Sequence, residues 1–267
     1  MNRLELVIFE NDPQIMQKYH NHGINHCLID MEVMGKDLRQ LGFDTDINPG
    51  TYHDLASIAA LPRVTSWCRL NQLGSWSEEE CEKAIAAGAQ ILILPMIRQR
   101  REVEEFLELI NGRTKICIML ETERAVELAE EVHGLPFEYA YFGLHDYNIA
   151  TGNRFIFKPL LDGTIEKVRR ILKDYKFGFA GLTDIAKGAP IPAIQILKEL
   201  ARLKANFVFL RRSFKKDVCI DHVQQSVSEI DRAWMQNISR TADEIAVDHN
   251  ILLETLSLAQ QNKLLAG

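Results

Sequence analysis

The sequence predicts an α/β fold: a closed (β/α)8 barrel with one extra helix at its C-terminal end. Eight short apolar runs are spaced along the 267 residues, and most are separated by segments with helical periodicity. The runs are almost continuously apolar, as expected for parallel strands covered on both faces. Eight strand–helix units fit a closed barrel better than an open sheet. The predicted strands are 4–10, 26–32, 64–70, 90–96, 115–121, 139–146, 176–183 and 206–212.

The intervening helices are recognised by apolar spacing and by their end signals. The segment after the third strand begins with a capping-box sequence, Ser77 to Glu80, and ends at Gly88. Apolar residues recur at intervals of three and four in 103–110 and 125–132, which end at Asn-Gly and at Gly. A further apolar face of this kind covers 194–203.

The chain from Thr241 onward predicts a helix outside the barrel ring. Thr241 to Glu244 is a capping-box sequence, and apolar residues then recur at intervals of three and four as far as Ala259. We assign residues 1–236 to the barrel and 237–267 to a C-terminal helical extension. We expect this helix to pack across a subunit boundary of a homo-oligomer; the alternative is a helix lying on its own barrel.

Composition excludes several classes of function. A net charge of −6 argues against a broad grip on nucleic acid or on an anionic membrane. No apolar run approaches the roughly 20 residues that span a bilayer. The N-terminus reads directly into a strand without a signal region, and the five scattered cysteines are typical of free thiols in a reducing cytoplasm. Gly-x-Gly-x-x-Gly after the first strand and Walker-type sequences are absent.

Two acids follow successive predicted strands. Glu121 ends 115–121, and Asp146 ends 139–146. Because the C-terminal ends of parallel barrel strands meet at one edge, the two carboxylates are expected to lie close together. Carboxylate oxygens suit Mg2+ or Mn2+, so the pair predicts a metal site. The alternative is that each acid merely caps the following helix.

Three further charged residues end the second and third strands. Asp30 and Glu32 point to the same side of their strand by period-two alternation. Arg69 ends the third strand, where its planar guanidinium could clamp a substrate carboxylate in two parallel hydrogen bonds. A structural salt bridge between Arg69 and Glu32 is the alternative. Asp30 and Glu32 could position a basic group or a water molecule.

Other segments carry weaker signals. Two connections, 33–49 and 147–158, are longer than the repeat requires, and such loops are often functional. His145 is expected to point away from Asp146 as a packed, hydrogen-bonded histidine. Arg211, Arg212 and Ser213 follow the last strand, a position that often binds phosphate in barrels, although paired basic residues are also common at surfaces.

These pieces together resemble a known family. The matching segments, in family order, are 23–33, 68–71, 88–97, 119–126 and 141–152, of which the last two are the most specific. They resemble the HpcH/HpaI aldolase and citrate lyase β-subunit family, part of the phosphoenolpyruvate/pyruvate superfamily of barrels.

The resemblance implies roles for particular residues. Glu121 and Asp146 would bind Mg2+ or Mn2+, and Arg69 would bind the carboxylate of a pyruvate or oxaloacetate unit. It also implies that the C-terminal helix packs against a neighbouring subunit. Beyond what the resemblance implies, we expect Asp30 and Glu32 to join Arg69 in catalysis, and Pro95 and Met96, in the segment 88–97, to contact the substrate.

One position departs from the family pattern. The aldolase branch usually has Asp-x-Glu-His after the second strand, and its histidine takes part in acid/base catalysis, whereas this chain has Val33. We therefore expect a metal-dependent carbon–carbon lyase or aldolase acting on a 2-keto acid and an aldehyde or acyl partner, with water or an acid from 33–49 replacing the histidine. The alternatives are an acyl-CoA lyase of the citrate or malyl type and a noncatalytic barrel that binds a keto acid.

Overall fold

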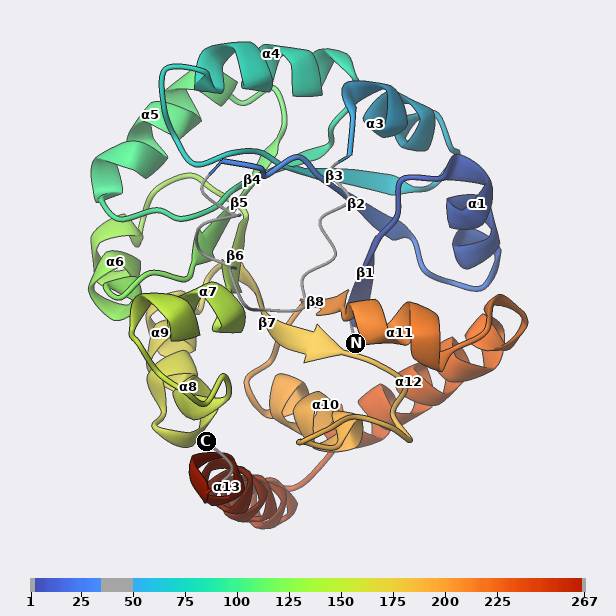
Figure 1. The fold of residues 1–267 in the computed structure, drawn as a ribbon, viewed down its shortest axis with the longest axis vertical. Helices are drawn as coiled ribbons and strands as arrows, with labels where there is room; N and C mark the ends of the chain where they lie inside the picture. Colours follow the sequence, from blue (N-terminus) through green and yellow to red (C-terminus); the bar gives the residue numbers. More distant parts are fainter. Residues whose placement is uncertain (1–2, 35–49, 266–267) are drawn as a thin grey trace.

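A computed structural model describes residues 3–34 and 50–265, and within them the chain forms a closed barrel of parallel strands ringed by helices (Figure 1). The strands follow one another around the ring in chain order, and the last pairs with the first. The predicted fold class is confirmed. The strands are β1 (Glu5–Phe9), β2 (His26–Asp30), β3 (Thr65–Arg69), β4 (Ile91–Leu94), β5 (Lys115–Leu120), β6 (Tyr139–Phe142), β7 (Lys176–Leu182) and β8 (Phe207–Leu210).

Helices follow the strands and cover the outside of the barrel (Figure 1). Their apolar faces pack on the outward-facing strand residues in one continuous core. The helices are α1 (Pro13–Asn21), α3 (Tyr52–Ala59), α4 (Ser77–Ala86), α5 (Arg100–Ile110), α6 (Ala125–Val132), α7 (Leu144–Ala150), α8 (Lys158–Leu161), α9 (Thr164–Ile171), α10 (Ala193–Arg202), α11 (Arg212–Asp217), the 3-10 helix η1 (Ile220–His222), α12 (Val223–Ile238) and α13 (Ala242–Leu265).

Two predicted boundaries were wrong. β6 ends at Phe142 and α7 begins at Leu144, so Asp146 lies in the first turn of a helix rather than at a strand tip. Ser77 does not cap α4 through a capping box, because it is the first helical residue and its hydroxyl accepts a hydrogen bond from the Gly74 amide at 3.0 Å. The capping box at Thr241, by contrast, is formed with Glu244.

The barrel interior is filled by aromatic side chains. Trp67 of β3 lies 5.0 Å from Tyr139 and 5.3 Å from Phe207, measured between ring centroids. Tyr141 stacks on Phe209 with 4.1 Å between centroids, one layer nearer the C-terminal ends of the strands. A packed interior leaves the chemistry to the end of the barrel where the charged residues lie.

The cysteines are all free thiols. Cys27, Cys68, Cys81 and Cys117 are buried, whereas Cys219, between α11 and η1, is exposed. Burial raises the pKa of Cys27 and of Cys81 to about 12, which keeps both as unreactive thiols.

Helix α13 lies outside the ring beside α8 and α10 of its own chain (Figure 1). Leu252 and Leu256 are buried against the barrel, and Asp248 binds Lys198 of α10 at 2.6 Å. One face of α13 therefore packs on its own barrel, which is the alternative that the sequence left open. The other face exposes Val247 and, with it, Ile251 and Leu258, and subunit contact through it stays a prediction.

The division at residue 236 also stays a prediction, although α12 continues to Ile238 and the turn before α13 follows it. Of the predicted long segments, most of 33–49 falls outside the described residues, whereas 147–158 forms most of α7 and the turns that lead to α8. None of the helices in the described part of the chain has the length and apolar character needed to cross a membrane.

Candidate active site

The site lies at the C-terminal end of the barrel, where inward-facing positions change from apolar to charged. In β2, β3 and β5, the inward column runs from Leu28 to Asp30, from Trp67 to Arg69, and from Met119 to Glu121. Period-two alternation explains why the last inward residue of each column shares one layer with the others. The strand register places Asp30 directly opposite Arg69.

Glu121 follows β5 and is only 1 % exposed. Its Oε1 accepts a hydrogen bond from the Met96 backbone amide at 3.0 Å, while Oε2 has no hydrogen-bond partner within 3–34 and 50–265. Met96 has a φ of 56°, which turns its amide toward the acid. Pro95 and Met96 are both buried, and direct contact of either with substrate stays a prediction.

Gly143 makes room for the Glu121 carboxylate. A Cβ atom at position 143 would lie 2.3 Å from Glu121 Oε2 and 2.9 Å from Glu121 Cβ. No side chain fits at that distance, so the glycine between β6 and α7 is required by the acid on the neighbouring strand. The sequence shows Gly143, but only the packing of β5 on β6 reveals its purpose.

Asp146 is close enough to Glu121 for the two charges to interact. Burial first, and then the charges of Asp146 and Glu32, raise the pKa of Glu121 well above its ordinary value of 4.5. Arg69 and the Met96 amide oppose that rise. The structure therefore brings Glu121 and Asp146 together as predicted, even though Asp146 arrives from the first turn of α7.

Arg69 is held by the acids of β2. Its Nε donates to Asp30 Oδ1 at 2.9 Å and its Nη2 donates to Asp30 Oδ2 at 2.6 Å, while Glu32 Oε2 lies 3.5 Å from Nε. Burial alone would lower the pKa of Arg69, but the charges of Asp30 and Glu32 outweigh burial and raise this pKa well above its ordinary value. Asp30 takes the Nε/Nη2 edge of the guanidinium, so the Nη1/Nη2 edge is the one that a substrate carboxylate could reach.

Asn71 anchors the chain at the start of the 33–49 segment. Its Oδ1 accepts hydrogen bonds from the amides of Val33 at 2.9 Å and Met34 at 2.8 Å, and its Nδ2 donates to Glu80 Oε1 at 2.6 Å. The Val33 side chain is 45 % exposed. Sequence reasoning assigned no role to Asn71, and no local signal distinguishes it from a surface amide.

The residues present fit a divalent cation. No group of three or more His, Cys, Asp or Glu side chains suited to a metal occurs in the described ranges. The Glu121–Asp146 pair nevertheless supplies hard oxygen donors, and the buried Glu121 Oε2 is without a partner in that part of the chain. A bound divalent cation would stabilise two neighbouring carboxylates at the end of the barrel.

Comparison with known proteins was made on both the sequence and the fold. No protein-family model matches the sequence, and no curated protein matches it. Several solved structures share the fold. An HpcH/HpaI aldolase/citrate lyase family protein from Burkholderia cenocepacia is 14 % identical with a TM-score of 0.60, covering 86 % of this chain and 95 % of that chain.

Two other structural neighbours have related descriptions. The citrate synthase SbnG is 14 % identical with a TM-score of 0.58, covering 85 % of this chain and 93 % of its own. The protein CitE from Mycobacterium tuberculosis, solved with magnesium and pyruvate, is 13 % identical with a TM-score of 0.59, covering 94 % and 98 %. At such identities the likeness establishes the fold, and the fold is one found in the family that the sequence resembles.

Proposed function

We propose that this chain belongs to the HpcH/HpaI aldolase and citrate lyase family and is a divalent-metal-dependent carbon–carbon lyase or aldolase for a pyruvate- or oxaloacetate-like 2-keto acid. The observation that carries the proposal is the buried Glu121 carboxylate, which has one oxygen without a partner in the described part of the chain and lies beside Asp146. The magnesium and pyruvate in the CitE structure support the same ligands here.

The metal would be Mg2+ or Mn2+, held by Glu121 and Asp146. When bound, it would supply Lewis-acid stabilisation of the charge that develops on the keto oxygen as the carbon–carbon bond breaks. The chain's own groups do the remaining work. Arg69 would bind the substrate carboxylate through Nη1, while Asp30 holds the guanidinium in place at 2.9 and 2.6 Å.

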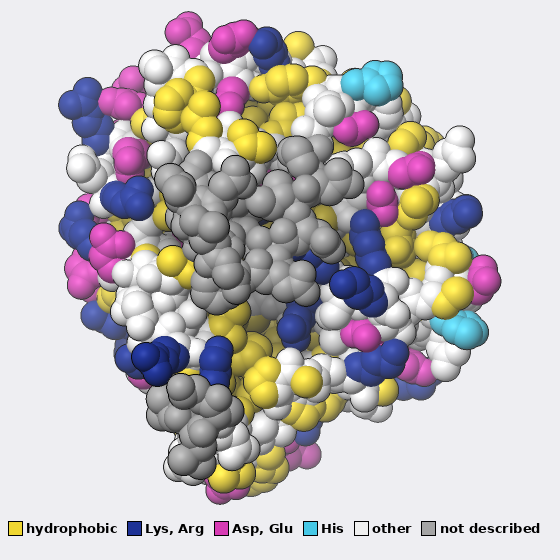
Figure 2. Space-filling view, viewed as in Figure 1, with side chains coloured by type: hydrophobic (Ala, Val, Ile, Leu, Met, Phe, Trp, Pro, Cys, Tyr) yellow, Lys and Arg dark blue, Asp and Glu magenta, His cyan; other side chains and the backbone are white. Residues whose placement is uncertain are grey.

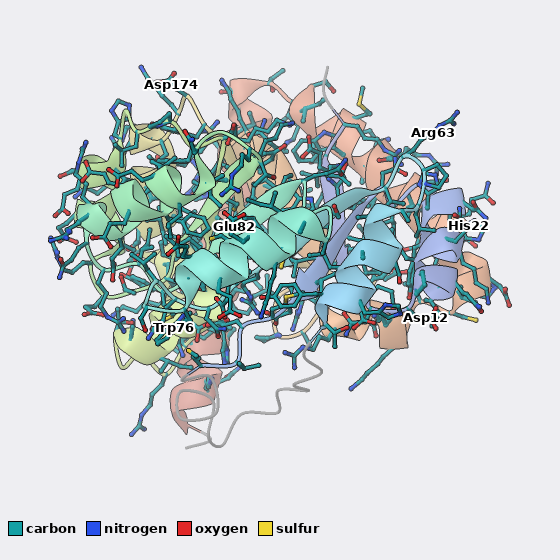
Figure 3. The ribbon with its side chains drawn as sticks, turned by 90° about the horizontal axis from the view of Figure 1, so that it is seen from above. Asp12, His22, Arg63, Trp76, Glu82 and Asp174 are labelled. Carbon is teal, nitrogen blue, oxygen red and sulfur yellow. The ribbon has the colours of Figure 1, made fainter. Side chains whose placement is uncertain are left out.

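Calorimetry with oxalate tests this proposal. Oxalate carries the two adjacent oxygens of an enolate of pyruvate, so we expect it to bind in the presence of Mg2+ or Mn2+ and not in the presence of EDTA. The variant Glu121→Gln should lose binding. Glu82→Gln is the matched control, because Glu82 lies on the outer surface of α4, paired with Arg113 (Figure 3). The proposal would be abandoned if the wild-type protein bound neither oxalate nor pyruvate with either metal.

A noncatalytic keto-acid-binding barrel is the second candidate. Val33 favours it, because an aliphatic side chain cannot transfer a proton and stands where the aldolase branch has histidine. Metal-dependent oxalate binding without turnover of a panel of 2-keto acids and aldehydes would select this candidate. Turnover of any member of the panel would select the lyase.

A further inference from the structure

The end of β8 and the first turn of α11 form a basic part of the barrel rim. Arg211, Arg212, Lys215 and Lys216 are all exposed there. Figure 2 shows Lys and Arg side chains gathered over the position of α11, beside the barrel opening. The rim is thus positive close to an interior site rich in carboxylates.

Arg211 is seated on the neighbouring strand. A Cβ atom at Gly181 of β7 would lie 2.6 Å from Arg211 Cγ, so the arginine stem crosses β7 where the glycine leaves space. β7 is irregular here, with a register shift between Gly178 and Gly181 and a φ of 58° at Ala180. Bulges of this kind re-aim backbone and side chains next to barrel sites.

Neither Arg211 nor Arg212 has a hydrogen bond or an ion pair through its guanidinium to any residue in 3–34 or 50–265. Lys215 differs, because it binds Glu10 at 2.7 Å. The hydroxyl oxygen of Ser213 is buried and has no partner in the same described ranges. Within the described ranges, two guanidinium groups without partners and the buried hydroxyl that follows them in the chain offer hydrogen-bond donors of the kind that oxyanions accept.

The position of Arg212 ties this donor set to the candidate active site. Arg212 lies near enough to His145 of α7 to interact with it electrostatically, and His145 directly precedes Asp146. A ligand group bound between α7 and α11 would therefore lie beside whatever the acids hold. β6, β7 and β8 are successive strands of the ring, so α7, the last residues of β7 with Gly181, and α11 lie at three adjacent strand ends.

We propose that Arg211, Arg212 and Ser213 form a binding site for a phosphate monoester dianion. Guanidinium groups match the geometry of phosphate oxygens, and the chain after the last strands of a barrel is a common phosphate site. This inference deepens the proposed function, on which its substrate class rests: the partner that joins or leaves the keto acid carries a phosphate group. The phosphate belongs either to a small phosphorylated molecule or to coenzyme A.

The site is tested by calorimetry on the full chain without divalent metal, using inorganic phosphate, glycerol 3-phosphate and glycerol. We expect saturable binding of the two phosphates and none of glycerol. Arg212→Ala should weaken phosphate binding about ten- to a hundredfold, as expected for loss of a charge-assisted hydrogen bond. Gly181→Ala should also weaken phosphate binding, because the added methyl group displaces the Arg211 stem. This variant keeps every charge.

The control is Arg63→Ala. Arg63 is exposed, and it lies at the barrel end opposite to Asp12 and Trp76, which follow strands at the opening (Figure 3). The Arg63→Ala variant should bind phosphate as tightly as the wild type does. The proposed site would be overturned if inorganic phosphate, glycerol 3-phosphate and coenzyme A all failed to bind saturably. It would also be overturned if Arg63→Ala and Arg212→Ala weakened phosphate binding equally.

Coenzyme A and dephospho-coenzyme A separate the two sources. Tighter binding of glycerol 3-phosphate would identify the partner as a small phosphorylated molecule. Tighter binding of coenzyme A than of dephospho-coenzyme A would identify the bound group as the phosphate of coenzyme A. Either result supports the site. Oxalate binding with Mg2+ is measured separately. If oxalate binds and no phosphate does, only this inference fails, and if phosphate binds and oxalate does not, only the proposed function fails.

Discussion

The two ends of the barrel treat charged side chains in opposite ways. At the N-terminal end, a cavity of about 370 Å³ is lined by Glu5, His26 and Lys176 among others, and Lys176 neutralises Glu5 at 2.7 Å. At the C-terminal end, Glu121 and Asp146 lie near one another, and Arg69 is already bound to Asp30.

This difference indicates which end of the barrel requires a ligand. The N-terminal end is balanced, because its lysine has its carboxylate and His26 accepts a hydrogen bond from Trp67 Nε1 at 3.1 Å. Among the described residues, the C-terminal end gathers Glu32, Glu121 and Asp146 around a single interior arginine, Arg69. An imbalance of buried charge is costly in folding free energy unless a ligand relieves it, which is typical of functional sites.

The largest expected effect comes from neutralising the acid at the C-terminal end. Glu121→Gln should lower affinity for Mg2+ and oxalate by more than about a hundredfold, because losing a side chain that binds the metal directly costs more than losing one that only orients such a side chain. The same variant should raise the melting temperature of the metal-free protein at neutral pH. Calorimetry and thermal unfolding in EDTA measure the two effects.

The sign of the second effect follows from the pKa of Glu121, which burial and then Asp146 raise above 4.5. Stability from such an acid is fully present below its unfolded pKa and is lost as pH rises through the folded pKa. The wild type without metal should therefore lose stability on raising the pH, and the variant should lose less. A lower melting temperature of Glu121→Gln in EDTA would contradict the contrast between the two ends.

A pair of ion-pair deletions comes next. Arg69→Ala leaves the buried Glu32 and the half-buried Asp30 without their guanidinium and should reduce the free energy of unfolding by about 3–5 kcal/mol. Lys176→Ala removes a lysine that is 43 % exposed, from a pair that solvent screens, and should cost less than about 1 kcal/mol. Urea denaturation compares them. Equal costs would show that the two ends do not differ in burial of charge.

A substitution at the C-terminal end should increase turnover. Val33→His places a proton-transferring side chain on backbone that Asn71 anchors at 2.9 Å. If the lyase reaction is limited by proton transfer, turnover of 2-keto acid substrates should rise about ten- to a hundredfold. Val33→Gln is the matched polar control and should leave turnover unchanged. An equal change in both variants would assign the effect to polarity alone.

The smallest effect belongs to the N-terminal end. Burial lowers the pKa of His26 below 6.5, and the charge of Glu5 opposes this. A base with a depressed folded pKa contributes stability that is lost as pH falls from 6.5 through the folded pKa, by at most about 1.4 kcal/mol per pH unit. His26→Asn keeps an acceptor for Trp67 and should flatten this part of the stability–pH curve. Unchanged pH dependence would place the titration elsewhere.

Much of this architecture is readable from local patterns, and some is not. Continuous apolar runs and end signals predict the eight strands, and alternation predicts that Asp30 and Glu32 share a side. The structural context of Asp146 was harder to predict, because the apolar run 139–146 continues into α7. Only the backbone turn at Gly143 ends the strand. Acid spacing still located Glu121 and Asp146 at one edge.

Long-range packing was beyond the sequence. Arg69 binds Asp30 most closely, which depends on the register between β2 and β3, and it also pairs at 3.5 Å with Glu32, the partner that the sequence suggested. The fit of Gly143 to Glu121 and of Gly181 to Arg211 depends on atoms from neighbouring strands. Roles of Asp30, Glu32, Arg69, Pro95 and Met96 in the reaction stay predictions.

The distribution of thiols has a practical consequence. Four cysteines are sealed inside the protein, and Cys219, just after α11, alone reaches solvent. A maleimide dye added to the native chain should therefore attach at a single defined place without any engineered substitution. Because that place adjoins the basic rim, fluorescence from the attached dye gives a direct optical signal for screening anions in a plate reader.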